Sequence, residues 1–200
     1  MKIAIIKYNA GNIMSVEYAM QRLGIEAEVT PDKEKILSAE KVIFPGVGEA
    51  STTMAYLKKH KLDELIRSLK QPVLGICLGM QLMCRHSEEN DVDCLGIFEE
   101  DVVRFVPEPG MENITKVPHM GWNEIFDLNS ALFDSSIENQ FVYFVHSYYA
   151  TKGEHTAAIC NYITPFTAAL HKDNFYATQF HPEKSGSVGE RILKNFIEKC

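Results

Sequence analysis

The stretch Pro72-Val73-Leu74-Gly75-Ile76-Cys77-Leu78-Gly79 joins a short apolar run to a Gly-x-Cys-x-Gly sequence. The run is typical of a buried strand that leads directly into Cys77. A strand-to-helix turn this tight tolerates only small flanking residues, and it holds the central side chain exposed in a strained backbone pose. We therefore predict an elbow with Cys77 at a helix start, where the dipole and free amides favour a thiolate. The alternative is a structural cysteine packed between two glycines.

The segments before this elbow alternate between two patterns. Strand-like runs occupy residues 3–8, 27–30 and 41–44. Helix-like repeats occupy residues 13–23, 54–57 and 62–69. The first helical repeat is followed by Gly24, where a helix-terminating glycine is expected. Strands separated by helices of this length indicate βαβ units and a parallel sheet that is covered on both faces.

The second half has more strands and fewer helices. Strand candidates occupy residues 102–106, 122–126, 141–145, 156–160, 167–171 and 176–180. A Ser-x-x-Glu pattern from Ser187 to Glu190 predicts a capping box at the start of a terminal helix. We expect an α/β fold in a single domain over residues 1–200: an open, mostly parallel sheet flanked by helices, with an additional antiparallel or mixed portion in the second half.

Composition excludes several classes of function. The formal charge of −7 argues against a nucleic-acid partner, because phosphate binding depends on clustered Lys and Arg. No run approaches the roughly 20 apolar residues that span a bilayer, and the apolar start is too short for a signal peptide, so we expect a cytoplasmic protein with no membrane contact. Five cysteines without a CxxC pair or zinc spacing predict neither disulfides nor a metal. No cofactor is expected, and we assign no role to four of the cysteines, Cys84, Cys94, Cys160 and Cys200.

A nucleophilic cysteine needs a base, and His181 is the best candidate. In Phe180-His181-Pro182-Glu183, an extended chain places positions i and i+2 on the same side, so Glu183 can orient the imidazole. The alternative is a hydrogen-bonded histidine at a strand end. The histidines at positions 60, 86, 155 and 171 lie among charged or loop-like residues and are expected at the surface.

Acyl transfer also needs amide donors for the developing oxyanion. The backbone N–H of Leu78, directly after the nucleophile, is the usual first donor. The loop Pro45-Gly46-Val47-Gly48 follows a predicted parallel strand, and its glycines allow a second N–H to turn toward a substrate. The alternative for this loop is an ordinary turn between a strand and a helix.

Together these segments resemble the class I glutamine amidotransferases, in which the cysteine elbow is followed much later by His-Pro-Glu. Further strings are similar to the glutaminase subunits of imidazole glycerol phosphate synthases, of histidine biosynthesis. They are Tyr8-Asn9-Ala10-Gly11-Asn12, Pro45-Gly46-Val47-Gly48, Pro118-His119-Met120-Gly121-Trp122-Asn123, Tyr143-Phe144-Val145-His146-Ser147-Tyr148 and His181-Pro182-Glu183-Lys184-Ser185. The resemblance covers nearly the whole chain and implies a flavodoxin-like sheet. The chain departs from it at Ala177, where a glycine is expected, and at Ile13-Met14, where related chains often carry Leu-Arg.

The resemblance implies a specific chemistry. Members of this family hydrolyse L-glutamine through a cysteinyl thioester and pass ammonia to a (β/α)₈-barrel cyclase subunit in a heterodimer. The cyclase converts a phosphoribulosyl aminoimidazole intermediate into imidazole glycerol phosphate and an aminoimidazole carboxamide ribotide. Because free ammonia becomes ammonium at neutral pH, we expect the cyclase to dock over the elbow. We also expect its ligand to switch on an otherwise nearly inactive glutaminase.

The resemblance also implies roles for individual residues. Cys77 is the nucleophile, His181 the acid and base, Glu183 its orienting partner, and the amides of Val47 and Leu78 form the oxyanion hole. Substrate is held by Gly48, Gln81, Ser147 and Tyr148. The partner face and ammonia gate comprise Asn12, Met120, Trp122, Asn123, Tyr143 and Lys184, and two further histidines, His119 and His146, support these loops.

Other functions remain open at this level. A stand-alone γ-glutamyl hydrolase or the glutaminase partner of another ammonia-using synthase, such as a vitamin B6 synthase, shares the elbow. Neither is expected to carry Pro118–Asn123 or His181–Ser185 in this form. A non-enzymatic thiol sensor needs a reactive cysteine but not a base and its orienting acid at triad spacing.

Overall fold

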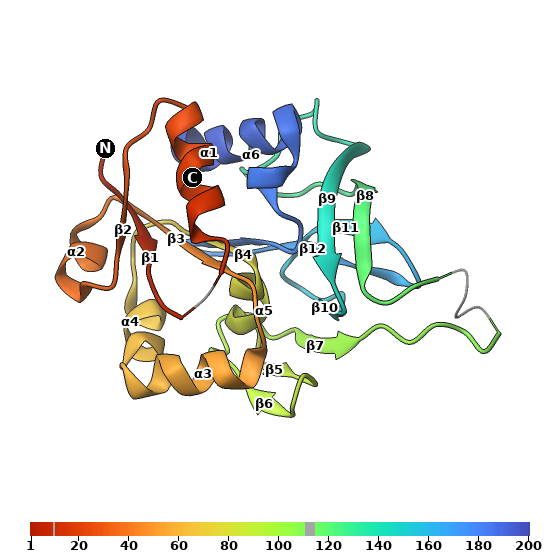
Figure 1. The fold of residues 1–200 in the computed structure, drawn as a ribbon. Helices are drawn as coiled ribbons and strands as arrows, with labels where there is room; N and C mark the ends of the chain where they lie inside the picture. The colour runs from red at the N-terminus through yellow and green to blue at the C-terminus, as the bar shows by residue number, and fades with distance from the viewer. Residues whose placement is uncertain (10, 111–114) are drawn as a thin grey trace.

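The computed structural model describes residues 1–9, 11–110 and 115–200, and its parallel sheet forms the centre of the molecule (Figure 1). The parallel strands lie in the order β2 (Ala27–Thr30), β1 (Ile3–Ile6), β3 (Lys41–Gly46), β4 (Val73–Cys77) and β13 (Phe175–Thr178). With β13 counted as the fifth strand, this is the flavodoxin-like order. The parallel part of the predicted fold is therefore confirmed.

Helices cover both faces of this sheet. They are α1 (Ile13–Arg22), α2 (Lys33–Ser38), α3 (Ala50–Lys59), α4 (Leu62–Ser68), α5 (Leu78–Met83) and α6 (Gly186–Lys199). Along β1, Ala4 and Ile6 pack with helices α2 to α5, whereas Ile3 and Ile5 pack with α1 and α6. Successive strand residues point to opposite faces, so a strand buried on both faces has the unbroken apolar run seen in the sequence.

The second half adds the antiparallel portion. Beyond β13 the sheet continues through β12 (Pro165–Lys172), β10 (Tyr148–Ala150), β7 (Asp101–Arg104), β5 (His86–Ser87) and β6 (Val92–Asp93), and β11 (Thr156–Asn161) pairs with β12. A separate hairpin joins β8 (His119–Ile125) to β9 (Gln140–His146) in continuous antiparallel register. The predicted mixed portion is confirmed, although the short strands β5, β6 and β10 were not anticipated.

Two helix boundaries follow from local chemistry. After α1, the amide of Gly24 donates to Gln21 O and that of Ile25 to Met20 O, which with the positive φ of Gly24 forms the expected glycine-terminated end. The helix α2, of six residues, was not predicted. The Asp32 carboxylate caps its start by accepting from the amide of Glu34 over 2.9 Å.

The predicted capping box at Ser187 is wrong. The helix α6 already begins at Gly186, which places Ser187 inside its first turn. Glu190 pairs instead with Arg22 of α1, at 3.1 Å. The hydroxyl before the helix, Ser185 Oγ, donates to His181 O over 2.7 Å and accepts the Tyr143 amide over 2.9 Å. The start of α6 is therefore tied to the His181 segment and to β9.

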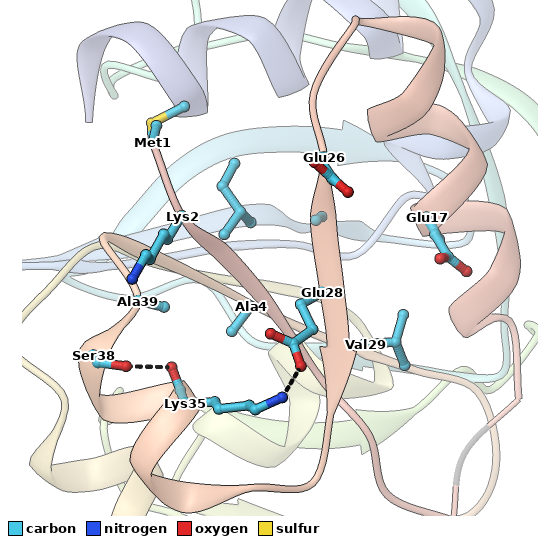
Figure 2. Close-up of a pocket in the computed structure, with 12 residues that line it drawn as sticks. Met1, Lys2, Ala4, Glu17, Glu26, Glu28, Val29, Lys35, Ser38 and Ala39 are labelled. Carbon is cyan, nitrogen blue, oxygen red and sulfur yellow. Dashed lines mark hydrogen bonds and ion pairs between the residues drawn. The ribbon is translucent and has the colours of Figure 1, made fainter.

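A surface hollow of about 700 Å³ lies along the outer strand β2, away from the elbow (Figure 2). Its wall carries Glu17, Glu26 and Glu28, and Lys35 reaches across to pair with Glu28 at 2.5 Å. Charged side chains of this kind protect an edge strand from pairing with another chain. Within the described residues, no helix is long and apolar enough to cross a membrane.

Candidate active site

The elbow at Cys77 has the strained geometry that its sequence predicts. Cys77 lies between β4 and α5 with φ 53° and ψ −107°, and its side chain reaches the surface at the carboxyl edge of the sheet with only 6% exposure. A Cβ at Gly79 would overlap the carbonyl oxygen of Phe44, and one at Gly75 would crowd the backbone of Gly79. Both glycines are therefore required by the close approach of α5 to the sheet.

His181 and Glu183 form a fully buried pair beside the elbow. The Nδ1 atom of His181 lies 2.7 Å from Oε1 of Glu183, and neither side chain is exposed. The expectation of an extended chain here is wrong, because Pro182–Lys184 form a 3₁₀ turn. This turn, rather than strand alternation, brings the carboxylate beneath the imidazole.

The electrostatics of this pair favour a proton on His181. Burial alone would lower the pKa of His181, but the negative charges of Cys77 and Glu183 outweigh burial and raise it well above its ordinary value. Within the described part of the chain, Oε2 of Glu183 is buried without a hydrogen-bond partner, and Nε2 of His181 has none apart from the neighbouring sulfur of Cys77. A ring nitrogen that no group but the sulfur engages is what a proton-transfer group requires.

Asn12 contacts the acid of this pair directly. It precedes α1 with φ 68°, a left-handed conformation that asparagine tolerates. Its Nδ2 atom lies 2.5 Å from Glu183 Oε1 and 3.4 Å from His181 Nδ1. Of the motif that contains it, Ala10 lies outside the described residues. The carboxyl ends of β1, β4 and β13 thus bring together residues that are far apart in the sequence.

A cleft of about 330 Å³ opens beside Cys77. Its lining comprises Val47, Gly48, Cys77, Leu78, Gln81, Glu89, Pro118, Val145, His146, Ser147 and Tyr148. All the residues that the resemblance assigns to the oxyanion hole and to substrate are among them. The volume is at the lower end of the range for small-molecule sites, which suits a ligand of amino-acid size.

The loop after β3 is anchored at both ends. Before it, the buried Tyr8 hydroxyl donates to Pro45 O over 2.6 Å. Burial and the charge of Cys77 both raise the pKa of Tyr8, which keeps the hydroxyl protonated as a donor. After the loop, Glu49 accepts from the amides of Ser51 and Thr52 at 2.7 and 2.8 Å. Although burial opposes it, this capping holds the pKa of Glu49 at about 2.

A chain of hydrogen bonds links the β8–β9 hairpin to the cleft. His146 Nδ1 lies 2.7 Å from Tyr148 O, which can only accept, so His146 Nε2 must accept from His119 Nδ1 at 3.1 Å. His119 Nε2 is then left as an acceptor 3.5 Å from the amide of Asn123. Burial lowers the pKa of His119 to about 4 and that of His146 to about 3, so both rings are neutral. They support the hairpin and the Tyr148 carbonyl.

The predicted partner-facing residues other than Asn12 lie on the hairpin and on the turn after His181. Met120 and Trp122 are 63% and 54% exposed on β8, and the Trp122 ring meets that of Tyr143 on β9 at a centroid distance of 6.0 Å. Lys184 is exposed at the end of the 3₁₀ turn, and Asn123 is half-buried. Exposed aromatic and methionine side chains in one region are characteristic of an interaction surface.

Comparison with known proteins identifies the family. Residues 4–200 match the family described as "Glutamine amidotransferase class-I". The chain is 66% identical, over 99% of its length and 100% of the relative's, to the imidazole glycerol phosphate synthase subunit HisH of Bacteroides thetaiotaomicron. It is 46% identical, with the same coverage, to the subunit of that name in Escherichia coli strain K12. The chain belongs to the class I glutamine amidotransferase family.

Solved structures agree with this amidotransferase at the level of the fold. One glutamine amidotransferase matches with a TM-score of 0.73 and 18% identity, over 98% of this chain and 97% of that one. A second, from Thermotoga maritima, has a TM-score of 0.63 and 15% identity, over 100% and 83% of the two chains. At these identities the likeness concerns only the fold, and it confirms the predicted fold class.

Sequence reasoning missed several side chains near the candidate site of this amidotransferase. Gln179 and Ser185 are buried on either side of His181, and Glu89 reaches the cleft from the segment after β5. Gln179 lies in the predicted strand 176–180 and Ser185 in the motif His181–Ser185, but neither was assigned a role. No sequence pattern pointed to Glu89. The expectation that His155 is a surface residue is wrong, because its side chain is 11% exposed and pairs with the buried Glu100 at 3.3 Å.

Proposed function

We propose that this chain is the glutaminase subunit of an imidazole glycerol phosphate synthase, working as a single domain in a cytoplasmic heterodimer. It would hydrolyse L-glutamine and pass ammonia to a (β/α)₈-barrel cyclase subunit. The proposal depends most on one observation, that the Cys77 elbow interacts with His181 of the buried His181–Glu183 pair. Full-length identity of 66% to a HisH subunit supports the choice of synthase.

The proposed reaction uses these groups in two stages. The sulfur of Cys77 attacks the side-chain amide carbon of glutamine, and the oxyanion is stabilised by the amides of Leu78 and Val47. Nε2 of His181 gives its proton to the departing nitrogen, the C–N bond breaks, and ammonia leaves a thioester behind. His181 then takes a proton from water as the water attacks the thioester. Cleavage of the C–S bond releases glutamate and regenerates Cys77.

The cleft offers matching groups for the backbone end of glutamine. Nε2 of Gln81 lies 2.9 Å from both Tyr148 O and Gln179 Oε1, so its two hydrogens are already donated. Its carbonyl oxygen is left as an acceptor, which suits the α-ammonium group of the substrate. Gly48, Ser147 and Tyr148 line the same cleft and would complete the contacts.

The cyclase would cover the exposed face formed by Met120, Trp122, Tyr143 and Lys184. Two hydrogen bonds tie this face to the base: the amide of His181 donates to the backbone oxygen of Tyr143 over 2.9 Å, and the amide of Tyr143 donates to the side-chain hydroxyl of Ser185. A partner pressing on β9 would therefore act on the segment that carries His181. Asn12, which holds Glu183, would lie at the inner margin of this face.

The test is glutamate release from glutamine by the purified chain, first alone and then with a cyclase subunit and its phosphoribulosyl aminoimidazole ligand. Activity that appears only in the full mixture and disappears in Cys77→Ser is the expected result. Cys84→Ser, which alters a buried thiol away from the cleft, is the matched control and keeps activity. Robust turnover by the chain alone would favour an independent hydrolase, and no turnover in any mixture would contradict the proposal.

A further inference from the structure

Gln179 lies against the sulfur of Cys77 but outside the lining of the cleft. It follows β13, its side chain is fully buried, and it does not line the cleft. Its amide nitrogen Nε2 lies 3.7 Å from Cys77 Sγ, within hydrogen-bond distance for sulfur, and its Oε1 accepts from Gln81 Nε2 over 2.9 Å. The backbone amide of Gln179 is fixed by Ala168 O at 2.8 Å.

The surrounding groups determine which end of the Gln179 amide faces the sulfur. Tyr148 O is a carbonyl and can only accept, so the atom of Gln81 that lies 2.9 Å from it must be the nitrogen. The same nitrogen lies 2.9 Å from Gln179, where its partner must then be the oxygen. This leaves the NH₂ group of Gln179 directed at Cys77.

We propose that Gln179 is a further catalytic residue, whose amide N–H donates to the sulfur of Cys77, stabilises the thiolate and holds it aimed at the cleft. Gln81 is the positioning residue that keeps Gln179 in this orientation. The catalytic role of Gln179 rests on the proposed function, but its contact with the sulfur of Cys77 does not. A hydrogen bond to an ionised acceptor is stronger than one to a neutral acceptor, so the donor favours the charged sulfur.

The other groups around the sulfur make a neutral donor useful. Val145 O lies 4.0 Å from Sγ and can only accept, so it favours the protonated thiol. Among the described residues, Tyr8 and the His181–Glu183 pair lie near the sulfur, and Glu89 and His146 line the same cleft as Cys77. Two of these are carboxylates and His146 is neutral. Gln179 supplies a donor that does not titrate and that is not consumed when His181 gives up its proton.

The test measures the ionisation of Cys77 without glutamine. The full chain is alkylated with iodoacetamide from pH 6 to 10, and the rate at Cys77 is followed by peptide mapping. Gln179→Met, which keeps the length but removes the donor, is expected to raise the midpoint of the rate profile by about one pH unit. Gln179→Glu, which places a carboxylate against the sulfur, is expected to raise it further.

Asn195→Leu is the matched control, because it removes another buried amide, one that donates to Leu132 O far from the elbow. It is expected to leave the midpoint unchanged. An unchanged midpoint in both folded Gln179 variants, or an equal shift in Asn195→Leu, would overturn the proposal. Since alkylation needs neither glutamine nor a cyclase, failure of the proposed function would leave this result interpretable. With the cyclase and its ligand present, Gln179→Met is expected to lower kcat for glutamine and to leave KM nearly unchanged.

Discussion

The side-chain amide of Asn12 donates to Oε1 of Glu183, the same oxygen that lies 2.7 Å from the ring nitrogen of His181. One carboxylate oxygen therefore serves two donors from opposite ends of the chain. The arrangement couples the start of α1 to the proposed base. It also gives Asn12 a role at the active site in addition to its expected place near the cyclase.

Asn12→Ala is expected to lower kcat of the assembled complex by roughly 10- to 100-fold, because a hydrogen bond to a charged group contributes about 1.5–3 kcal/mol. Glutamine turnover is measured at saturating cyclase, so that any weaker association does not contribute. Asn9→Ala, a change at an exposed residue of the same loop, is the control. Equal turnover in the two variants would show that the Asn12 contact has no catalytic role.

The site was predictable where a local pattern carried it, and less so where tertiary contacts decide. The elbow glycines and the His181–Glu183 spacing are readable because steric limits act within a few residues. The contact of Asn12 with Glu183 spans 171 positions, and the Gln179 donor depends on an amide orientation set by Gln81 and Tyr148. No periodicity encodes such contacts. The wrong capping box at Ser187 has a similar cause, since packing against His181 and Tyr143 determines where α6 begins.

Tyr8→Phe tests the anchor of the loop after β3. The hydroxyl donates to Pro45 O directly before the Gly46–Val47 peptide, so its loss leaves a buried carbonyl unpaired. We expect the free energy of unfolding to fall by about 1–3 kcal/mol and glutamine turnover to fall with it. Tyr56→Phe on α3 is the control, and urea unfolding with parallel assays is the measurement. Unchanged turnover and stability in Tyr8→Phe would contradict the anchoring role.

Gly79→Ala is expected to prevent normal folding of the elbow, because the new Cβ would overlap Phe44 O within a packed sheet. Gly24→Ala provides the comparison. It has open space around its Cβ, and its cost of roughly 1–2 kcal/mol comes from the positive φ alone. Thermal unfolding of both variants distinguishes the two causes. A Gly79→Ala protein as stable as Gly24→Ala would show that α5 can move away from the sheet.

Trp122→Ala is expected to weaken the complex with the cyclase by at least tenfold, since large aromatic residues at the centre of an interface carry much of the binding energy. Leu37→Ala, at a similarly exposed apolar residue on α2 outside this face, is the control. Titration calorimetry with the cyclase gives both dissociation constants. Equal affinities would place the cyclase on another surface.

The buried His119–His146 pair predicts how stability depends on pH. Each folded-state pKa, about 4 and about 3, lies below the ordinary histidine value near 6.5, so the unfolded chain binds more protons between these values. The contribution of this pair to the free energy of unfolding is therefore fully present above about pH 7. It falls as the pH decreases, by up to about 1.4 kcal/mol per pH unit for each histidine. His181 does not contribute near pH 5, because its raised pKa leaves it protonated in both states there.

His119→Gln keeps a hydrogen-bonding side chain but removes one titrating ring, so it is expected to reduce the slope of the unfolding free energy between pH 4.5 and 5.5 by up to about 1.4 kcal/mol per pH unit. Asn195→Leu, which removes a buried amide and no titrating group, is expected to leave the slope unchanged. Urea unfolding at a series of pH values measures both slopes. If His119→Gln retains the full slope, the protons taken up on acid unfolding bind to other groups. The histidine pair would then not be the cause of acid sensitivity.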